Sequence, residues 1–207
     1  MLKVSKEVYS PAEDSFLLEG CILKEKLNGK ECLDLGCGSG IQSIALLRAE
    51  AKRVVAVDIN DNALKVTQKN VTIFLKEQKA RNSKTQNVGH FLVLKSDLFL
   101  NLNQKFDFIS FNPPYVPSDE VKWVDLDGGE RGRVVIDRFL PKVHTHLKDG
   151  GVLLLLVSSL NEPKEIISML NEYSFSVKIV GRKKLFFEEL IVLRAVKEKI
   201  NISVSGF

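Results

Sequence analysis

The sequence predicts an α/β fold in which helices cover both faces of a doubly wound sheet. Short apolar segments alternate with longer segments of helical periodicity along most of the 207 residues. A glycine-rich segment, Gly36–Gly40, directly follows the first apolar segment and opens a helix. Two adjacent strand-like segments close the pattern and suggest an antiparallel pair. With 44% hydrophobic and 27% charged residues, the chain can bury the core of a globular domain.

The first expected helix spans residues 11–27. Ser10 is suited to cap it, and Pro11 would occupy the first helical position, where its missing N–H costs nothing. A short apolar strand is expected at 31–35, followed by a helix at 41–50.

The middle of the chain continues the alternation. The β-branched run at 53–57 predicts a second strand, and the periodicity of 61–79 predicts a helix after it. Further strands are expected at 91–94 and 106–111. The polar segment 77–87 is expected to be an exposed loop.

The C-terminal part begins with an expected helix at 134–147. The uninterrupted apolar run 152–157 is typical of a strand buried on both faces. A short helix is expected at 163–170, and an antiparallel pair of strands at 175–180 and 185–193.

No change of composition marks a domain boundary, so residues 1–207 are expected to form one domain. Within it we expect an N-terminal helical segment at 1–29, a catalytic core at 30–196 and a loosely ordered tail at 197–207. The glycine-rich and acidic segment 118–133 is a second expected exposed loop, long enough to have a functional role.

Charge and cysteine content exclude several classes of protein. The net charge is only +4, and the short basic run at 182–184 is not a nucleic-acid-binding patch, so direct nucleic-acid binding is not expected. Cys21, Cys32 and Cys37 show neither disulfide nor zinc spacing, so no metal site is expected. The chain shows no signal peptide and no membrane-length apolar run, which favours a cytoplasmic protein.

The most informative motif is Asn112-Pro113-Pro114-Tyr115, directly after the strand expected at 106–111. The two prolines stiffen the loop and leave backbone carbonyls without neighbouring N–H donors. Such a loop can hold a planar –NH2 group. The Asn112 oxygen and a proline carbonyl would accept its two N–H bonds, and the Tyr115 ring would stack on its face. The motif therefore predicts group transfer to nitrogen.

Polar side chains end four successive strands. They are Asp34, beside the glycine loop of Gly36, Gly38 and Gly40; Asp58, followed by Ile59; Asp97, followed by Leu98; and Asn112. The ligand crevice of an open α/β sheet lies outside these strand ends. Asp34 suits a cationic amine, Asp58 suits ribose hydroxyls, and Asp97 with Leu98 suits an adenine ring. The glycine spacing differs from that of dinucleotide-dependent oxidoreductases.

Together these motifs resemble the class I S-adenosylmethionine-dependent methyltransferases. The resemblance implies a Rossmann-like seven-stranded sheet of order 3-2-1-4-5-7-6, with strand 7 antiparallel. The segments 8–15 and 128–139 are similar to two motifs of the HemK family, in its short archaeal and eukaryotic branch. That family methylates the glutamine side-chain amide in the Gly-Gly-Gln motif of class I translation release factors.

The family resemblance also implies roles for individual residues. The catalytic loop would be Asn112, Pro113, Pro114 and Tyr115. S-adenosylmethionine would contact Ser15, Asp34, Gly36, Gly38, Gly40, Asp58, Ile59, Asp97, Leu98 and Asn112. The resemblance further implies a release factor as substrate and a small zinc-binding activator protein on an edge strand.

The strand expected at 91–94 would be that edge. Phe91, Leu92, Val93 and Leu94 are all apolar, and only Lys95 discourages pairing with another chain. Either the polar loop at 77–87 or a partner protein could cover it. Three other activities remain open at this point: N6-adenine methylation of DNA or RNA, protein lysine methylation, and a non-catalytic scaffold.

Overall fold

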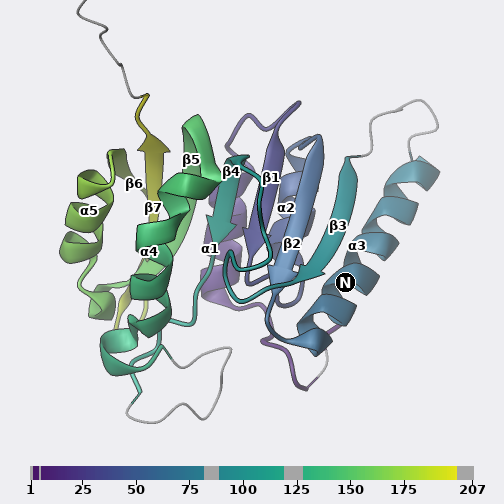
Figure 1. Ribbon diagram of the computed structural model, residues 1–207. Helices are drawn as coiled ribbons and strands as arrows, with labels where there is room; N and C mark the ends of the chain where they lie inside the picture. The colour runs from purple at the N-terminus through teal and green to yellow at the C-terminus, as the bar shows by residue number, and fades with distance from the viewer. Residues whose placement is uncertain (1, 5, 82–88, 119–127, 200–207) are drawn as a thin grey trace, which may run out of the picture.

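The computed structural model describes residues 2–4, 6–81, 89–118 and 128–199. Within them, seven strands form one sheet of order β3-β2-β1-β4-β5-β7-β6 (Figure 1). The strands β3, β2, β1, β4 and β5 are parallel, whereas β7 is antiparallel to both β5 and β6. The strand order and the antiparallel seventh strand confirm the fold expected from the sequence.

The strands are β1 (Glu31–Leu35), β2 (Arg53–Asp58), β3 (His90–Lys95), β4 (Phe106–Phe111), β5 (Leu147–Ser158), β6 (Phe175–Lys184) and β7 (Glu189–Lys197). The helices are α1 (Glu13–Ile22), α2 (Ile41–Arg48), α3 (Asp61–Arg81), α4 (Val134–His146) and α5 (Pro163–Glu172), with 3-10 turns η1 (Glu130–Gly132) and η2 (Ser159–Asn161).

Helix α1 and the closing strand pair, β6 and β7, differ from the bounds expected from the sequence. Helix α1 starts two residues after Pro11 and ends at Ile22, so it is much shorter than the expected 11–27, and no side chain caps its N-terminus. Strand β6 is longer than the expected 175–180, because a register shift between Ile179 and Gly181 lets its pairing continue to Lys184, and β7 begins and ends four residues later than the expected 185–193. Such a bulge is not visible in the hydrophobic pattern.

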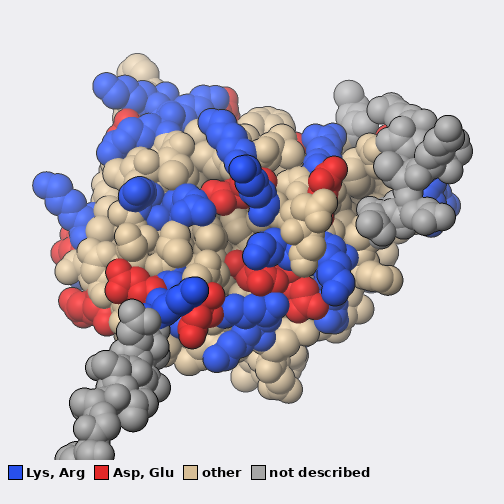
Figure 2. All heavy atoms as spheres, turned by 90° about the horizontal axis from the view of Figure 1, so that it is seen from above, with Lys and Arg blue, Asp and Glu red and all other residues tan. Residues whose placement is uncertain are grey.

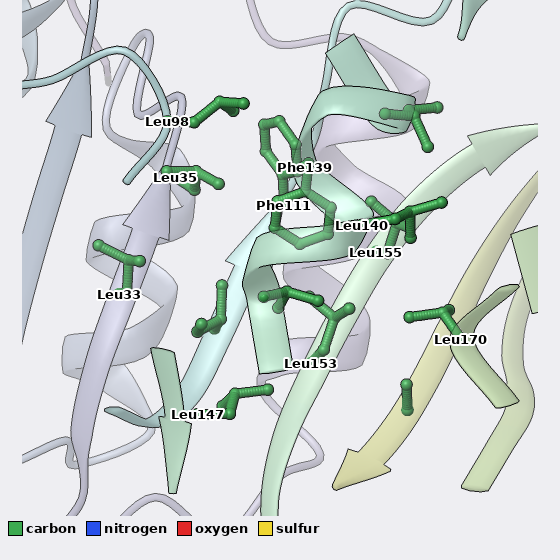
Figure 3. Packing of buried hydrophobic residues seen from close by; sticks show 14 of the residues in the cluster. Leu33, Leu35, Leu98, Phe111, Phe139, Leu140, Leu147, Leu153, Leu155 and Leu170 are labelled. Carbon is green, nitrogen blue, oxygen red and sulfur yellow. The ribbon is translucent and has the colours of Figure 1, made fainter. Parts of the chain in front are cut away.

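Two layers of helices cover the sheet (Figure 1). Helices α1 and α2 bury their apolar side chains in one cluster, and α4 and α5 bury theirs in another cluster on the opposite face. Figure 3 shows the second cluster, in which Phe139 of α4 lies against Phe111 at the end of β4, with ring centroids 4.8 Å apart. This packing fixes the end of β4, from which the Asn112–Tyr115 loop departs.

The amino ends of the parallel strands form the edge seen from above in Figure 2. Lysines and arginines on this edge are interspersed with carboxylates. Lys148 lies 2.9 Å from Asp107 and 3.6 Å from Glu31. Basic and acidic side chains are thus mixed over this face (Figure 2). Within the described residues, no helix is long and apolar enough to cross a membrane.

Candidate active site

A cavity of about 190 Å³ lies at the opposite edge, where the parallel strands have their carboxyl ends. The expected catalytic loop lines it with Asn112, Pro113, Pro114 and Tyr115. The expected cofactor residues that line it are Gly36, Gly38, Asp58, Ile59, Asp97 and Leu98. Ser15, Asp34 and Gly40 are not among the lining residues. The sheet therefore brings together most of the residues that the sequence selected, from four separate strand ends.

Asn112 is held in one orientation. Its Nδ2 donates a hydrogen bond of 3.0 Å to Oδ2 of Asp14. A carboxylate can only accept, so the amide must turn its NH2 toward Asp14 and its oxygen away. Oδ1 of Asn112 is buried and has no hydrogen-bond partner among the described residues. The site thus presents an unpaired acceptor where a buried polar atom would normally be satisfied.

Asp14 is a site residue that sequence reasoning did not select, although it lies in the 8–15 motif. Its side chain is 3% exposed and lines the cavity. Besides Asn112 it accepts hydrogen bonds from the Tyr9 hydroxyl (3.1 Å) and the Ser15 backbone N–H (2.6 Å). Because Asp14 and Asn112 are 98 residues apart, only the folded chain shows that they meet.

Two tyrosines line the cavity on either side of Asp14. Burial, followed by the charge of Asp14, raises the pKa of both Tyr9 and Tyr115 above the ordinary tyrosine value. Both phenols therefore stay protonated at neutral pH. Tyr115 is thus suited to pack and donate a hydrogen bond, not to remove a proton.

The glycine loop turns from β1 into α2. Gly36 and Gly38 have φ angles of +66° and +49°, which residues with side chains rarely adopt. The Gly38 N–H donates to Oδ2 of Asp58 at 3.0 Å, which joins the loop to the end of β2. Gly40 has a different role. A Cβ there would lie 3.1 Å from Thr67 of α3, so Gly40 lets the two helices pack closely.

Two further buried acceptors lie behind the glycine loop. Asp34 accepts a 2.6 Å hydrogen bond from the Ser43 hydroxyl through Oδ2, but its Oδ1 has no partner. Gln42, which the sequence analysis did not select, donates to the Ser15 carbonyl at 2.9 Å and leaves its Oε1 unpaired. With Oδ1 of Asn112, these unpaired oxygens make this side of the site suited to a ligand that donates hydrogen bonds.

Burial, offset in part by hydrogen bonds from Ser43, raises the pKa of Asp34 from 3.8 to about 7. The folded protein therefore binds this proton more tightly than the unfolded chain. The stabilisation is complete below about pH 4 and is lost as the pH rises through about 7. We expect Asp34→Asn to raise the free energy of unfolding at pH 8 by about 2–4 kcal/mol. Urea unfolding at pH 5 and pH 8 measures this, and an equal pH dependence in both proteins would contradict it.

Asp97 and Leu98, which follow β3, also line the cavity. The Asp97 carboxylate pairs with Arg138 of α4, a lining residue that the sequence analysis missed. Leu98 has a φ of +51° and its carbonyl accepts a 2.8 Å hydrogen bond from Ser96. The positive φ is unusual for leucine, and strained residues of this kind cluster at functional sites.

The expected exposed loop at 118–133 is only partly tested, because residues 119–127 lie outside the described residues. Its C-terminal part is largely buried, which corrects the expectation. Gly128 N–H donates to the Val116 carbonyl at 2.8 Å, and Asn161 of η2 donates to the Tyr115 carbonyl at 2.8 Å. The buried Arg133 is held by Asp137 (2.9 Å) and Glu165 (2.6 Å). These contacts hold the catalytic loop in place, and we call residues 128–133 the clamp.

Gly132 is the tightest point of that clamp. Its φ is +66°, and a Cβ there would collide with the Tyr115 carbonyl and the Asn161 side chain. We expect Gly132→Ala to displace Tyr115 and to lower both methyl transfer, by about tenfold or more, and thermal stability. Gly150→Ala is the matched control, because Gly150 also has a positive φ but open space around it. Equal losses in both variants would contradict the clamp.

Fold and site together define a class of protein: a Rossmann-like methyltransferase with an acceptor-rich loop at the carboxyl edge of the sheet. The model of the methyltransferase small domain family matches residues 14–187. The chain is 41% identical over 200 residues to a Methanocaldococcus jannaschii protein named as a protein N5-glutamine methyltransferase, and the match covers 94% of each chain. The protein belongs to the methyltransferase small domain family and, within it, to the HemK group.

Eukaryotic and bacterial methyltransferases are also similar to this chain. Human methyltransferase HEMK2 is 32% identical over 202 residues, which cover 92% of this chain and 90% of the human protein. The release factor glutamine methyltransferase of Streptococcus pneumoniae is 30% identical, but only 55% of its length is matched. A solved structure of E. cuniculi Mtq2 with Trm112, described as responsible for methylation of the eRF1 termination factor, has a TM-score of 0.71 at 30% identity, covering 93% of this chain and 99% of that one.

Proposed function

We propose that this protein methylates the side-chain amide nitrogen of the glutamine in the Gly-Gly-Gln motif of a class I translation release factor, with S-adenosylmethionine as methyl donor. The names and descriptions of its relatives support the substrate class. The single observation that carries the chemistry is the Asn112 amide: the residue lines the cavity, its NH2 is bonded to Asp14, and its buried Oδ1 has no partner among the described residues.

The residues of the cavity fit S-adenosylmethionine. Gln42 lines the cavity, and its unpaired Oε1 suits a cationic amine, which would lower the cost of its burial. Asp34 lies behind the glycine loop and would add a carboxylate near that amine without lining the cavity. Asp58 at the end of β2 would accept hydrogen bonds from ribose hydroxyls, and Asp97 with Leu98 would hold the adenine. When bound, the sulfonium cofactor supplies an electrophilic methyl group. Tyr9 and Asp14 line the cavity, which supports the proposal that the N-terminal helical segment and the core 30–196 belong to one domain.

The catalytic loop holds the amide nitrogen. One N–H of the substrate amide would donate to Oδ1 of Asn112 and the other to the Pro113 carbonyl, while the Tyr115 ring covers its face. Both bonds raise the electron density on nitrogen and fix its approach to the methyl group. The methyl group would come from the sulfonium, whose S–CH3 bond breaks to leave a neutral thioether, and the alkylated nitrogen, now far more acidic, would release its proton to water. Tyr115, which stays protonated, is therefore not needed as a base.

The test is transfer of label from S-adenosylmethionine to a purified class I release factor. Three controls are assayed in parallel. They are a release factor with Gln→Ala in its Gly-Gly-Gln motif, a release factor whose lysines have been methylated beforehand, and an oligonucleotide. The expected result is label on the unmodified and the lysine-methylated release factor, and none on the Gln→Ala factor or the oligonucleotide. Label on the Gln→Ala factor would indicate lysine methylation, and label on the oligonucleotide would indicate adenine methylation.

We also propose that a small zinc-binding protein covers the free edge of β3, at Phe91–Leu94. Strand β3 pairs only with β2 among the described strands, and Leu92 is exposed at this edge. The Trm112 partner of Mtq2 supports a partner of this kind. The segment 82–88, the other expected cover, lies outside the described residues. Sedimentation of the pure chain as a stable, fully active monomer would argue against the partner.

A further inference from the structure

The turn between β6 and β7 carries two exposed phenylalanines. Phe186 is 91% exposed and Phe187 is 85% exposed, and their rings meet edge to face with centroids 4.6 Å apart. The turn itself is closed by a 2.8 Å hydrogen bond from the Leu185 N–H to the Glu188 carbonyl. Two aromatic side chains at the tip of an ordered hairpin leave a large apolar area in water, and such areas mark interaction sites.

This turn lies at the catalytic edge of the sheet. Strand β6 is antiparallel to β7, and β7 is antiparallel to β5, so β6 ends at the same edge as β5. The Glu189 N–H, directly after the turn, donates to the Ser159 hydroxyl of η2 at 3.0 Å. At the other end of η2, Asn161 holds the Tyr115 carbonyl. The hairpin is therefore connected to the catalytic loop through a single short turn.

The end of the catalytic loop, η2 and the hairpin each carry exposed apolar side chains. They are Val116 (39% exposed), Leu160 (47%), Leu185 (36%), Phe186 and Phe187, and we call them the apolar strip. The charge of Glu188 contributes to the raised pKa of both Tyr9 and Tyr115, so the hairpin lies within electrostatic range of these two cavity residues. A substrate whose side chain enters the cavity would lie over this strip.

We propose that the apolar strip is the docking surface for the methyl-accepting protein, with Phe186 and Phe187 as its anchors. The inference rests on the proposed function and adds where the substrate binds outside the cavity. Lys183 and Lys184, at the end of β6, are exposed and have no carboxylate partner among the described residues, so the matching surface is apolar with an acidic rim. Aromatic residues are the side chains that most often anchor protein interfaces.

A protein fits this surface better than RNA. Nucleic-acid bases stack on the free faces of aromatic rings, whereas Phe186 and Phe187 pack edge to face against each other. Glu188 follows directly and would repel a phosphate backbone. The neighbouring Arg182 already pairs with Glu189.

The test compares two substrates with the double variant Phe186→Ala/Phe187→Ala. One substrate is an intact class I release factor, and the other is a short peptide that contains Gly-Gly-Gln but is too small to reach the hairpin. We expect KM for the release factor to rise about tenfold or more, with kcat unchanged. Kinetics with the peptide and calorimetric affinity for S-adenosylmethionine should not change. Leu100→Ala is the matched control, because Leu100 is an equally exposed apolar residue outside the strip.

The outcomes separate the docking surface from the activity itself. Wild-type transfer to the release factor tests the proposed function. An unchanged KM in the double variant would overturn the docking surface and leave that function intact. Equal losses with peptide and release factor would also overturn it, because the turn would then only support the catalytic loop. Loss of RNA binding in a gel-shift assay, without a change in KM for the release factor, would assign the strip to RNA instead.

Discussion

Asn112→Ala is expected to remove methyl transfer almost completely, with a fall in kcat of about a thousandfold. The variant loses the oxygen that would accept a hydrogen bond from the substrate amide, and an amide nitrogen is too weak a nucleophile to react without being held. Oδ1 of Asn112 is already buried and unpaired before a substrate arrives. The protein has therefore met the cost of desolvating this acceptor during folding, and the substrate gains the full bond.

Affinity for S-adenosylmethionine should change by only a few fold in Asn112→Ala, because the glycine loop, Asp58 and Asp97 remain. Calorimetry with the cofactor, together with single-turnover kinetics on the release factor, separates the two quantities. Asn103→Ala is a suitable control, since Asn103 is an exposed asparagine with no side-chain hydrogen bond. Turnover close to that of the unsubstituted protein would refute the role of Asn112.

The sheet and most of its site could be predicted because both depend on local signals. Buried parallel strands appear as apolar runs, and polar residues at their carboxyl ends converge because all parallel strands end at one edge. That geometry placed Asp58, Asp97 and Asn112 together without any knowledge of pairing. The same rule says nothing of how deep a side chain lies. Asp34 precedes the glycines in sequence, but it is buried beneath the loop and does not line the cavity.

The remaining site residues could not be predicted, because they arrive through long-range packing. Arg138 lies on α4, on the face of the sheet opposite α1 and α2, and it reaches the site only when α4 packs beside β4. Tyr9 lies outside any helix or strand, where periodicity carries no information. The clamp at Gly132 depends on a backbone approach that only the folded chain reveals, although its glycine-rich motif hinted at a tight turn.

Asp14→Asn is expected to lower kcat by about a hundredfold while KM for the cofactor changes little. The carboxylate of Asp14 can only accept, so it forces the NH2 of Asn112 toward itself and the oxygen toward the substrate. An asparagine at position 14 offers a donor as well as an acceptor. The Asn112 amide is then free to turn over, and in the wrong orientation its NH2 opposes the N–H groups of the substrate. Kinetics with the release factor, at saturating cofactor, measure the loss.

Two comparisons distinguish this orienting role from a general effect of charge or stability. Glu13→Gln removes one negative charge from the same turn of α1, where the side chain is exposed, and should leave kcat unchanged. Asp14→Asn combined with Asn112→Ala should be no slower than Asn112→Ala alone, because Asp14 acts only through the Asn112 amide. Additive losses in the double variant would mean that Asp14 contacts the substrate or the cofactor itself. The unpaired oxygen of Asn112 would then be a consequence of packing and not the acceptor that selects an amide nitrogen.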